Sequence, residues 1–355
     1  MVELEGLQRT CALLDYVELV PALKASVFIG LQDTEGLQLK LSSEVAVSVT
    51  LPQKLGLDKP KAVDRRLLLP FVAHKGTYKG EIKDNMLFLR QGHRKAKIPL
   101  LDLDWTYGDW QLEKNKSTVV LSKELINKIE CAGMCAADRT VLPELSGVYI
   151  EFGKQALVFA ANDVVFCHGR AGYKSEIKSM VVPIPLVAPI VKEGVNTIFV
   201  KGQIVGFELE GARVWSQAPE KTWTDFPVER LKKLILTSRK ETSNFTVKTS
   251  EFAAVCKQFS GYLGSCGAEG ALSLQTTDKG RLKMKLNAGG FANFENTIKA
   301  DIKQELAETE INLAIAEPVF SFLKDKEEDA QFTALESVHH IKSGDYEFLF
   351  SVRLK

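Results

Sequence analysis

A helix followed by two strands, within residues 121–170, constrains the fold of this chain more than any other stretch. In the segment LSKELINKIECAGMCAADR, Leu125 and Ile129 stand one helical turn apart among charged neighbours, which predicts an amphipathic helix. In the next segment, LSGVYIEF, apolar residues alternate with Tyr149 and Glu151, as in a strand with one buried face. The same order of elements recurs before and after this stretch. The sequence therefore predicts long tandem repeats.

Three copies of this unit account for the whole chain. We place them at residues 1–116, 117–238 and 239–355, each with two helices and about eight strands. The first copy is expected to open with a helix over residues 3–18, and the third with a helix over residues 246–264. The expected fold class is α+β, with two helices packed on antiparallel sheets in every repeat.

Composition describes an ordinary soluble protein with no strong overall charge. Hydrophobic residues make up 45% and charged residues 26%, and the formal net charge is +1, so any field that attracts a partner has to be local. Six cysteines occur without a CxxC pair, and the chain opens MVELEGLQ with no apolar leader, which predicts a reduced cytoplasmic location. The apolar run VVPIPLVAPIVKEG is broken by prolines, so we expect no membrane partner.

The patterns of common catalytic and metal sites are missing from the sequence. Cys131 and Cys135 share a helix face, but no His or further Cys stands near enough in sequence to complete a zinc site, and buried apolar residues explain them better. GYLGSCGAEG lacks the lysine and hydroxyl residue of a phosphate-binding loop, and no GxSxG or HExxH occurs. We therefore expect no enzyme activity, no metal and no cofactor.

The order and spacing of five segments resemble the bacterial-type DNA polymerase sliding clamp, the β subunit of the replicative polymerase. LSKELINKIECAGMCAADRTVLPELSGVYIEF resembles the start of that family's middle domain, and ALVFAANDVVFCHG resembles its strand-turn-strand with the signature ATDGHRLA. IPLLDLDWTYGDWQ and ARVWSQAPEKTWTDFPVERL resemble the segments that end the first and second domains, and YEFLFSVRLK resembles the C-terminal MPMRL or MPVRL. No motif is specific alone, but five matches in order cover essentially the whole chain.

Two departures from the family pattern concern partner binding. The Asp-Gly-His-Arg of the middle-domain turn is replaced by Asn162, Asp163, Val164 and Val165, and the proline of the C-terminal motif is Ser351. The resemblance therefore leaves the peptide preference open. Divergence of this degree suits a phage-encoded or otherwise remote clamp.

The resemblance implies a function as well as a fold. Family members are head-to-tail homodimers whose three tandem clamp-type domains per chain close a ring around duplex DNA. Such a ring holds DNA by topology, so its positive inner wall needs only weak, salt-sensitive phosphate contacts. The implied partners are double-stranded DNA, a DNA polymerase, a clamp loader and other clamp-motif proteins. The implied location is the cytoplasm, at the nucleoid, or the host cytoplasm for a phage protein.

The inner wall is expected to draw its positive charge from the predicted helices and from one loop that touches DNA in family members. The helix residues are Arg9, Arg65, Arg66, Lys123, Lys128, Lys192, Lys257, Lys324 and Lys326, and the loop residue is Arg139. Each one alone is equally well explained as part of a solvated helix face. As a set they favour DNA binding, because a nearly neutral protein attracts phosphate only where it concentrates basic residues.

A second implied site is an apolar cleft for partner peptides between the middle and last domains. The positions carried over are Leu145 on the strand after the loop, Phe166, Phe350, Val352, Arg353 and Leu354, with Leu234 or Ile235 of the linker at one side. Phe166, Val352 and Leu354 are also explained as core residues of edge strands, whereas Arg353 is not.

The implied dimer joint brings the third repeat of one protomer against the first repeat of the other. We expect Tyr262 and Leu263, at the end of a helix, to face Ile98 and Leu100 on the last strands of the first repeat. Both pairs are also explained as interior residues.

Two other functions stay open beside the clamp. A scaffold built of the same repeats would bind proteins without encircling DNA, and it is favoured if the basic residues do not converge on one concave surface. A hydrolase assembled from scattered Cys, His and Asp residues would leave no sequence trace, and an activity panel would detect it.

Overall fold

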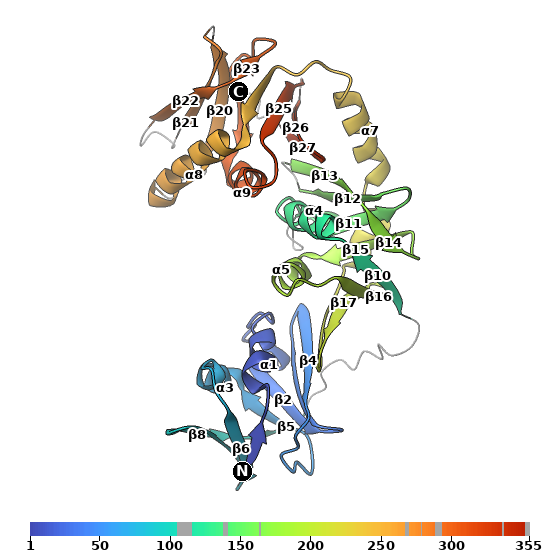
Figure 1. Ribbon diagram of the computed structural model, residues 1–355, viewed down its shortest axis with the longest axis vertical. Helices are drawn as coiled ribbons and strands as arrows, with labels where there is room; N and C mark the ends of the chain where they lie inside the picture. Colours follow the sequence, from blue (N-terminus) through green and yellow to red (C-terminus); the bar gives the residue numbers. More distant parts are fainter. Residues whose placement is uncertain are drawn as a thin grey trace. The chain divides into compact units, whose positions relative to one another are not determined.

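The computed structural model describes residues 1–104, 116–137, 141–162, 165–266, 270–277, 279–287, 293–335 and 337–351 of the 355. The chain forms two compact units (Figure 1). Unit 1 comprises Met1–Val119 and Ala188–Gln217, and unit 2 comprises Val120–Val187 and Ala218–Lys355. Four predicted site residues lie outside the described residues, namely Arg139, Val352, Arg353 and Leu354.

The described elements recur along the chain as three sets of nine strands, with two longer helices in the first and third sets and three in the second. The first set is β1 (Val2–Leu4), β2 (Phe28–Asp33), β3 (Leu37–Ser42), β4 (Val45–Leu51), β5 (Lys61–Asp64), β6 (Tyr78–Lys83), β7 (Met86–Gln91), β8 (Arg94–Pro99) and β9 (Leu101–Asp102), with α1 (Leu7–Leu14), α2 (Lys24–Val27) and α3 (Arg65–Val72).

The second set is β10 (Ser117–Leu121), β11 (Gly147–Phe152), β12 (Ala156–Ala161), β13 (Val165–Ala171), β14 (Tyr173–Ser175), β15 (Ser179–Pro183), β16 (Thr197–Lys201), β17 (Ile204–Leu209) and β18 (Ala212–Gln217), with α4 (Lys123–Gly133), the 3-10 helix η1 (Pro143–Leu145), α5 (Ile184–Lys192), α6 (Glu220–Asp225) and α7 (Val228–Ser238).

The third set is β19 (Phe245–Lys248), β20 (Ala271–Thr277), β21 (Arg281–Asn287), β22 (Asn293–Lys299), β23 (Asp301–Ile302), β24 (Thr309–Asn312), β25 (Asp329–Ala334), β26 (Val338–Ser343) and β27 (Tyr346–Ser351), with α8 (Thr249–Cys266) and α9 (Leu313–Leu323). The predicted α+β class, with helices on antiparallel sheets, is confirmed.

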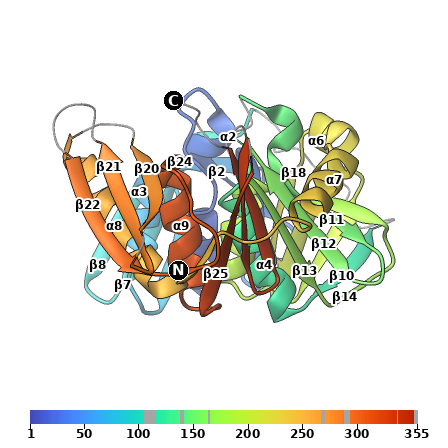
Figure 2. The same cartoon turned by 90° about the horizontal axis from the view of Figure 1, so that it is seen from above.

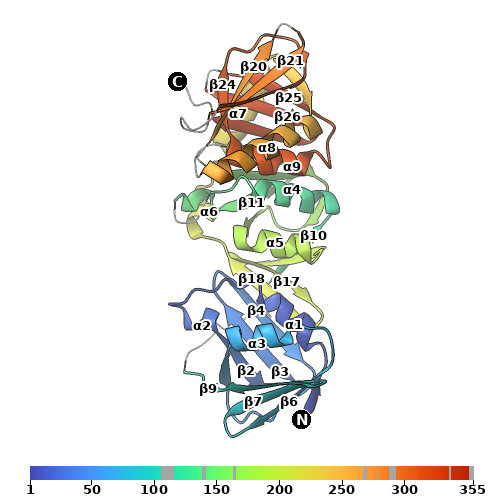
Figure 3. The same cartoon turned by 90° about the vertical axis from the view of Figure 1, so that its left-hand side faces the viewer.

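Unit 1 contains a large sheet, which includes the strand order β10-β16-β17-β18-β4-β3-β2-β5-β9, and a small sheet in the order β1-β6-β7-β8. The pairing of β18 with β4 joins strands from the first and second sets, with Trp215 opposite Ala46. Helices α1 and α3 cover one side of β2, β3 and β4 (Figure 3). They bury Leu7, Leu14 and Leu68, so the apolar helix stripe predicted from the sequence faces the sheet.

Unit 2 contains a sheet in the order β15-β11-β12-β13-β27-β26-β25-β19-β23 and a small sheet in the order β22-β21-β20-β24. The pairing of β13 with β27 joins strands of the second and third sets, with Phe166 opposite Leu349. Helices α8 and α9 lie side by side (Figure 3), where the rings of Phe252 and Phe320 are 4.3 Å apart and both approach Phe332. These aromatic contacts form the centre of that half of the unit.

Two helix predictions are wrong in their limits. The helix expected over residues 3–18 is α1 alone, because Val2–Leu4 pairs with β6 and Gly6 takes a left-handed φ of 75° just before the helix. The helix expected over residues 246–264 loses its first residues to β19, which pairs with β25, and α8 starts at Thr249. In both places an extended segment gains sheet hydrogen bonds that a local periodicity does not show.

Gly206 is a position where the fold of unit 1 excludes any side chain. A Cβ there would lie 2.4 Å from the carbonyl oxygen of Val214 and 2.5 Å from Cζ of Phe199. We expect Gly206→Ala to lower the free energy of unfolding of unit 1 by about 1–3 kcal/mol, because the core has to shift around the methyl group. Urea unfolding measures it, with Gly172→Ala as control, since a Cβ at Gly172 meets no atom within 4 Å. An equal effect of the two changes would contradict this packing.

No helix in the described part of the chain combines the length and the apolar content that crossing a membrane requires.

Candidate nucleic-acid and partner-binding surfaces

Six of the predicted DNA-contacting residues have exposed side chains. They are Arg9 on α1, Lys123 on α4, Lys192 on α5, Lys257 on α8, Lys324 at the end of α9, and Lys326 just after it. Lys192 Nζ also lies 5.1 Å from the ring centroid of Tyr16. Their contact with DNA stays a prediction.

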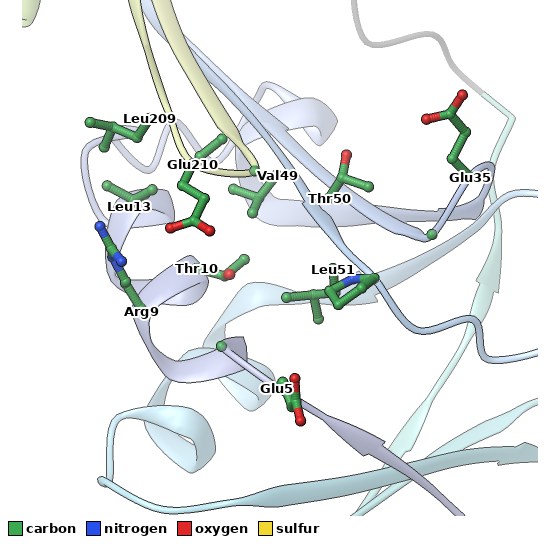
Figure 4. A pocket seen from close by; sticks show the side chains of 15 residues that line it. Glu5, Arg9, Thr10, Leu13, Glu35, Val49, Thr50, Leu51, Leu209 and Glu210 are labelled. Atoms are coloured by element: carbon green, nitrogen blue, oxygen red, sulfur yellow. The ribbon is translucent and has the colours of Figure 1, made fainter.

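Arg9 stands at the wall of a cavity of about 590 Å³ in unit 1 (Figure 4). The cavity is lined by α1, the end of β4 and the turn between β17 and β18, with Leu13 among its apolar residues. Glu5, Glu35 and Glu210 line it too, so the lining carries three carboxylates and one guanidinium. We therefore expect phosphate to bind more weakly at Arg9 than an isolated arginine would allow.

Arg65 and Arg66, which begin α3, are already used inside unit 1. Nη1 of Arg65 donates to the carbonyl oxygens of Val17 (2.7 Å) and Ser26 (3.2 Å), and burial lowers the pKa of this guanidinium. Arg66 is exposed, but its Nη2 lies 2.5 Å from Oδ2 of Asp64, whose carboxylate also accepts the Arg66 backbone N–H and caps the helix. The Arg65 guanidinium is therefore used inside unit 1, whereas Arg66 is held only by an exposed pair and its contact with DNA stays a prediction.

The prediction that Lys128 lies on an accessible helix face is wrong. Its side chain is 4% exposed, and its ammonium lies 3.2 Å from the ring centroid of Tyr346 on β27. The lysine stem covers Gly169 on β13, where a Cβ would come within 2.8 Å of Lys128 Cδ. Burial lowers the pKa of Lys128, although the carboxylates of Asp345 and Glu327 favour its charged form. Lys128 therefore holds α4 to the sheet and cannot reach phosphate.

Cys131 on α4 and Cys135, two residues after that helix ends, are packing residues, as their sequence context indicates. Cys131 and Cys135 are fully buried, and burial raises the pKa of the Cys131 thiol well above its usual value. Among the described residues, no group of three or more His, Cys, Asp or Glu side chains is arranged to hold a metal ion.

An apolar cluster in unit 2, here called the α7 cluster, contains two of the predicted pocket residues and an unexpected helix. The sheet contributes Phe159, Ala161, Phe166 and Leu349, the segment of α6 and α7 contributes Phe226, Val228, Leu231 and Ile235, and Leu145, Tyr149, Leu157 and Val338 pack at its edge. Figure 2 shows α7 beside the strands that carry these residues. Leu145 lies in η1, and its predicted place on a strand is wrong.

Two other residues predicted for the pocket, Leu234 and Phe350, have side chains that point away from the α7 cluster. Leu234 is 41% exposed on the outer side of α7, whereas Ile235, the alternative, is buried in the cluster. Phe350 is fully buried but is absent from the cluster, and its neighbour Leu349 takes the expected place. Successive residues of a strand point to opposite faces, so Phe350 lies on the face of β27 away from the α7 cluster, and its place in a peptide pocket stays a prediction.

A buried ion-pair network joins the end of α7 to β27. The Arg239 guanidinium donates two hydrogen bonds to the Glu347 carboxylate, one of 2.8 Å from Nε, and His340 Nε2 lies 3.1 Å from Oε2 of Glu347. Burial alone would raise the pKa of Glu347, but the bonds to Arg239 and His340 hold it well below its usual range. Pairing of β26 with β27 brings His340 close to Glu347, and Arg239 reaches them from the end of α7, so no local pattern in the sequence predicts this network.

The predicted dimer residues lie near two strands that stand at the edge of their sheets in the described part of the chain. Ile98 and Leu100 are 3% and 2% exposed, so their predicted role as contact side chains is wrong, and the edge strand β8 offers a partner its backbone instead. Tyr262 and Leu263 on α8 are half-buried. The Tyr262 ring stacks at 4.1 Å on Phe294 of β22, which is the other edge strand.

Comparison with solved structures identifies the fold. The DNA polymerase III β subunit of Thermotoga maritima matches with a TM-score of 0.81 at 13% identity, covering 100% of this chain and 99% of that one. The β subunit of Pseudomonas aeruginosa matches at 0.78 and 15%, and the Helicobacter pylori β clamp bound to a DNA ligase peptide at 0.75 and 15%, both with full coverage of both chains. No protein-family model and no curated protein sequence matches the chain. The chain thus has the three-domain fold of the bacterial sliding clamps.

Proposed function

We propose that this chain is a sliding clamp, a processivity factor without enzyme activity of its own that works in the cytoplasm. Two copies would close a ring around duplex DNA and hold a DNA polymerase on its template. The observation that carries this proposal is a fold shared with bacterial clamps over the whole chain, at TM-scores of 0.75 to 0.81. At identities of 13% to 15%, the structural similarity is evidence for the fold alone. Encirclement of DNA and tethering of a polymerase are therefore part of the proposal.

The proposed ring uses three domains per chain, at residues 1–116, 117–238 and 239–355. The threefold recurrence of nine strands in the described residues supports this division. We propose that the edge strands β8 and β22 of two copies pair, because an unpaired edge is a ready surface for backbone hydrogen bonds. Sedimentation should then give twice the 39.4 kDa of one chain.

The proposed hold on DNA is topological and only weakly electrostatic. With Arg65 and Lys128 committed to internal contacts, exposed helix residues such as Lys123 and Lys257 would carry the phosphate contacts. Few contacts on a protein of net charge +1 predict weak, salt-sensitive affinity for DNA with free ends.

The proposed partner surface is the α7 cluster and its edge. The Helicobacter pylori clamp was solved with a DNA ligase peptide, so that clamp binds a short segment of another protein. We propose that a DNA polymerase, a clamp loader and other clamp-motif proteins reach this chain in the same manner, through apolar side chains.

Retention on DNA with and without free ends tests the ring. We expect the protein to co-elute with nicked circular plasmid in gel filtration at about 0.3 M salt, where non-topological contacts are weak. Cutting the circle with a single-site nuclease should release at least about nine-tenths of the bound protein. When both ends of the linear DNA are blocked by bound streptavidin, the protein should again be retained. Equal retention on circular and open linear DNA would favour a scaffold that never encircles DNA.

A further inference from the structure

We infer that α7 is a displaceable cover, and that the sheet surface beneath it receives an amphipathic segment of a partner protein. The surface lies on β12, β13 and β27, and α7 occupies it in this structure. The inference deepens the proposed tethering of partners and rests on it. It adds that partner binding and α7 docking exclude one another.

The underside of α7 has the pattern of a docked helix. Val228, Leu231 and Ile235 follow a spacing of three and four residues, and all three are buried, at 9%, 8% and 3% exposure. They lie on Phe159 and Phe166, whose rings stack at 6.0 Å on adjacent strands. This is how an amphipathic helix lies in an apolar groove.

Side chains alone attach α7 to the sheet. In the described part of the chain, each backbone hydrogen bond recorded for the helix stays within residues 226–241, and none reaches a strand. Beyond the apolar contacts, two ion pairs hold it, one from Lys232 Nζ to Glu151 Oε2 at 2.7 Å and one from Arg239 to Glu347. A helix without backbone bonds to its sheet can leave without breaking the ladder.

The chain on either side of α7 is anchored independently of the helix. Before it, the buried Thr222 hydroxyl donates to the carbonyl oxygen of Pro143. After it, the Asn244 N–H donates to the carbonyl oxygen of Phe332 at 2.7 Å. The segment between these anchors can therefore swing out as a loop while both ends stay in place. The conformational entropy gained by the freed residues opposes the apolar burial and the two ion pairs, and so reduces the cost of opening.

The contacts of α7 define the partner's chemistry. It would present aliphatic side chains at the spacing of Val228, Leu231 and Ile235, and an aromatic ring for Phe226, which stacks at 5.1 Å on Tyr149. With α7 gone, the carboxylates of Glu151 and Glu347 lose Lys232 and Arg239 and would attract basic residues of the incoming segment.

A peptide of residues 226–239, FPVERLKKLILTSR, with a fluorescent label is the probe, and the full chain without DNA is the receptor. We expect Leu231→Ala with Ile235→Ala, which loosens the cover and leaves the sheet unchanged, to tighten peptide binding at least tenfold over wild type. Leu236→Ala is the matched control, since Leu236 is 58% exposed on α7 and should not alter binding. Adding Phe166→Ala to the loosened variant should abolish binding. Unchanged or weaker binding to the loosened variant, or binding that survives Phe166→Ala, would overturn the inference.

Hydrogen exchange on the wild-type chain gives a second, independent measurement that needs no variant. We expect amides of α7 to exchange at least 100-fold faster than those of β12 and β13. Equal protection of the amides of α7 and of these strands would overturn the inference that α7 is a displaceable cover. Neither measurement uses DNA. A negative result in either one would therefore not count against the ring, and a negative result in the ring test would not change the interpretation of these two measurements.

Discussion

Replacing Lys128 by Glu is expected to lower the free energy of unfolding of unit 2 by about 3–5 kcal/mol, the range for an unpaired charge left in a buried site. The lysine is 4% exposed, its ammonium lies over the Tyr346 ring, and Asp345 and Glu327 are close enough to act on its charge. A carboxylate in its place would lose the attraction of the ring and repel both acids. Part of the unit should unfold at ordinary temperature.

The measurement is urea unfolding followed by tryptophan fluorescence and circular dichroism. Lys123→Glu is the matched control on the same helix, because Lys123 is exposed in the first turn of α4, where a negative charge is favourable. We expect that control to stay within about 0.5 kcal/mol of wild type. A Lys128→Glu protein as stable as the control would mean that the lysine is accessible after all.

This result decides which residues can report on DNA contact. Charge reversal at Lys128 would reduce DNA retention through unfolding, so loss of binding there carries no information on phosphate contacts. Reversal at exposed Lys123, Lys257 and Lys324 avoids this difficulty. The salt dependence of binding should then fall by about one ion per contact removed.

The succession of helices and strands could be read from the sequence because its signals are local. Strand β11 carries the alternation of residues 147–152, and α4 starts where Ser122 offers its hydroxyl oxygen to the Leu125 N–H at 3.0 Å. The resemblance to sliding clamps then predicted how the repeats combine into one fold. The solved structures share that fold, at sequence identities too low for a match by sequence.

Which face each side chain occupies could not be read in the same way. Lys128 lies three residues after Leu125 and directly before Ile129, both fully buried, so its position on the helix is on the covered side despite its charge. Leu349 replaces Phe350 in the α7 cluster because pairing of β27 with β13 fixes which residues face α7. Residue type indicated the opposite choice for Lys128, and the position in the C-terminal motif did so for Phe350.

The helix α7 was missed although its signals are in the sequence. Pro227 stands directly before Val228, Leu231 and Ile235, a start signal followed by helical spacing. The neighbouring TDFP resembles the domain-ending turn of clamps, and that resemblance predicts a turn without a helix after it. The cluster that α7 forms with Phe166 requires a contact between distant segments, which no local pattern contains.

Replacing Glu347 by Gln is expected to lower the free energy of unfolding of unit 2 by about 3 kcal/mol at pH 7. Its side chain is 6% exposed, and its loss leaves the Arg239 guanidinium and the buried His340 without their carboxylate. Glu328→Gln is the control, because that side chain is 80% exposed in its pair with Lys248 and should contribute less than about 1 kcal/mol. Urea unfolding of the three proteins measures both values.

The pH dependence identifies the carboxylate as the source of this stability. Burial alone would raise the pKa of Glu347, yet Arg239 and His340 hold it well below 4.5, the ordinary value that a glutamate has in the unfolded chain. As pH falls below about 4.5 the unfolded chain gains a proton that the folded chain does not, so stability present above that pH is progressively lost below it. The difference between wild type and Glu347→Gln should therefore shrink between about pH 5 and pH 3. Burial lowers the pKa of His168 and His339 to about 4, so both also reduce stability in acid. His339 is unaffected by Glu347 and cancels in the difference, whereas the Glu347 charge raises the pKa of His168, so losing that charge opposes part of the shrinkage below about pH 4. A difference that stays constant from pH 7 to pH 3 would exclude the Glu347 charge as its cause.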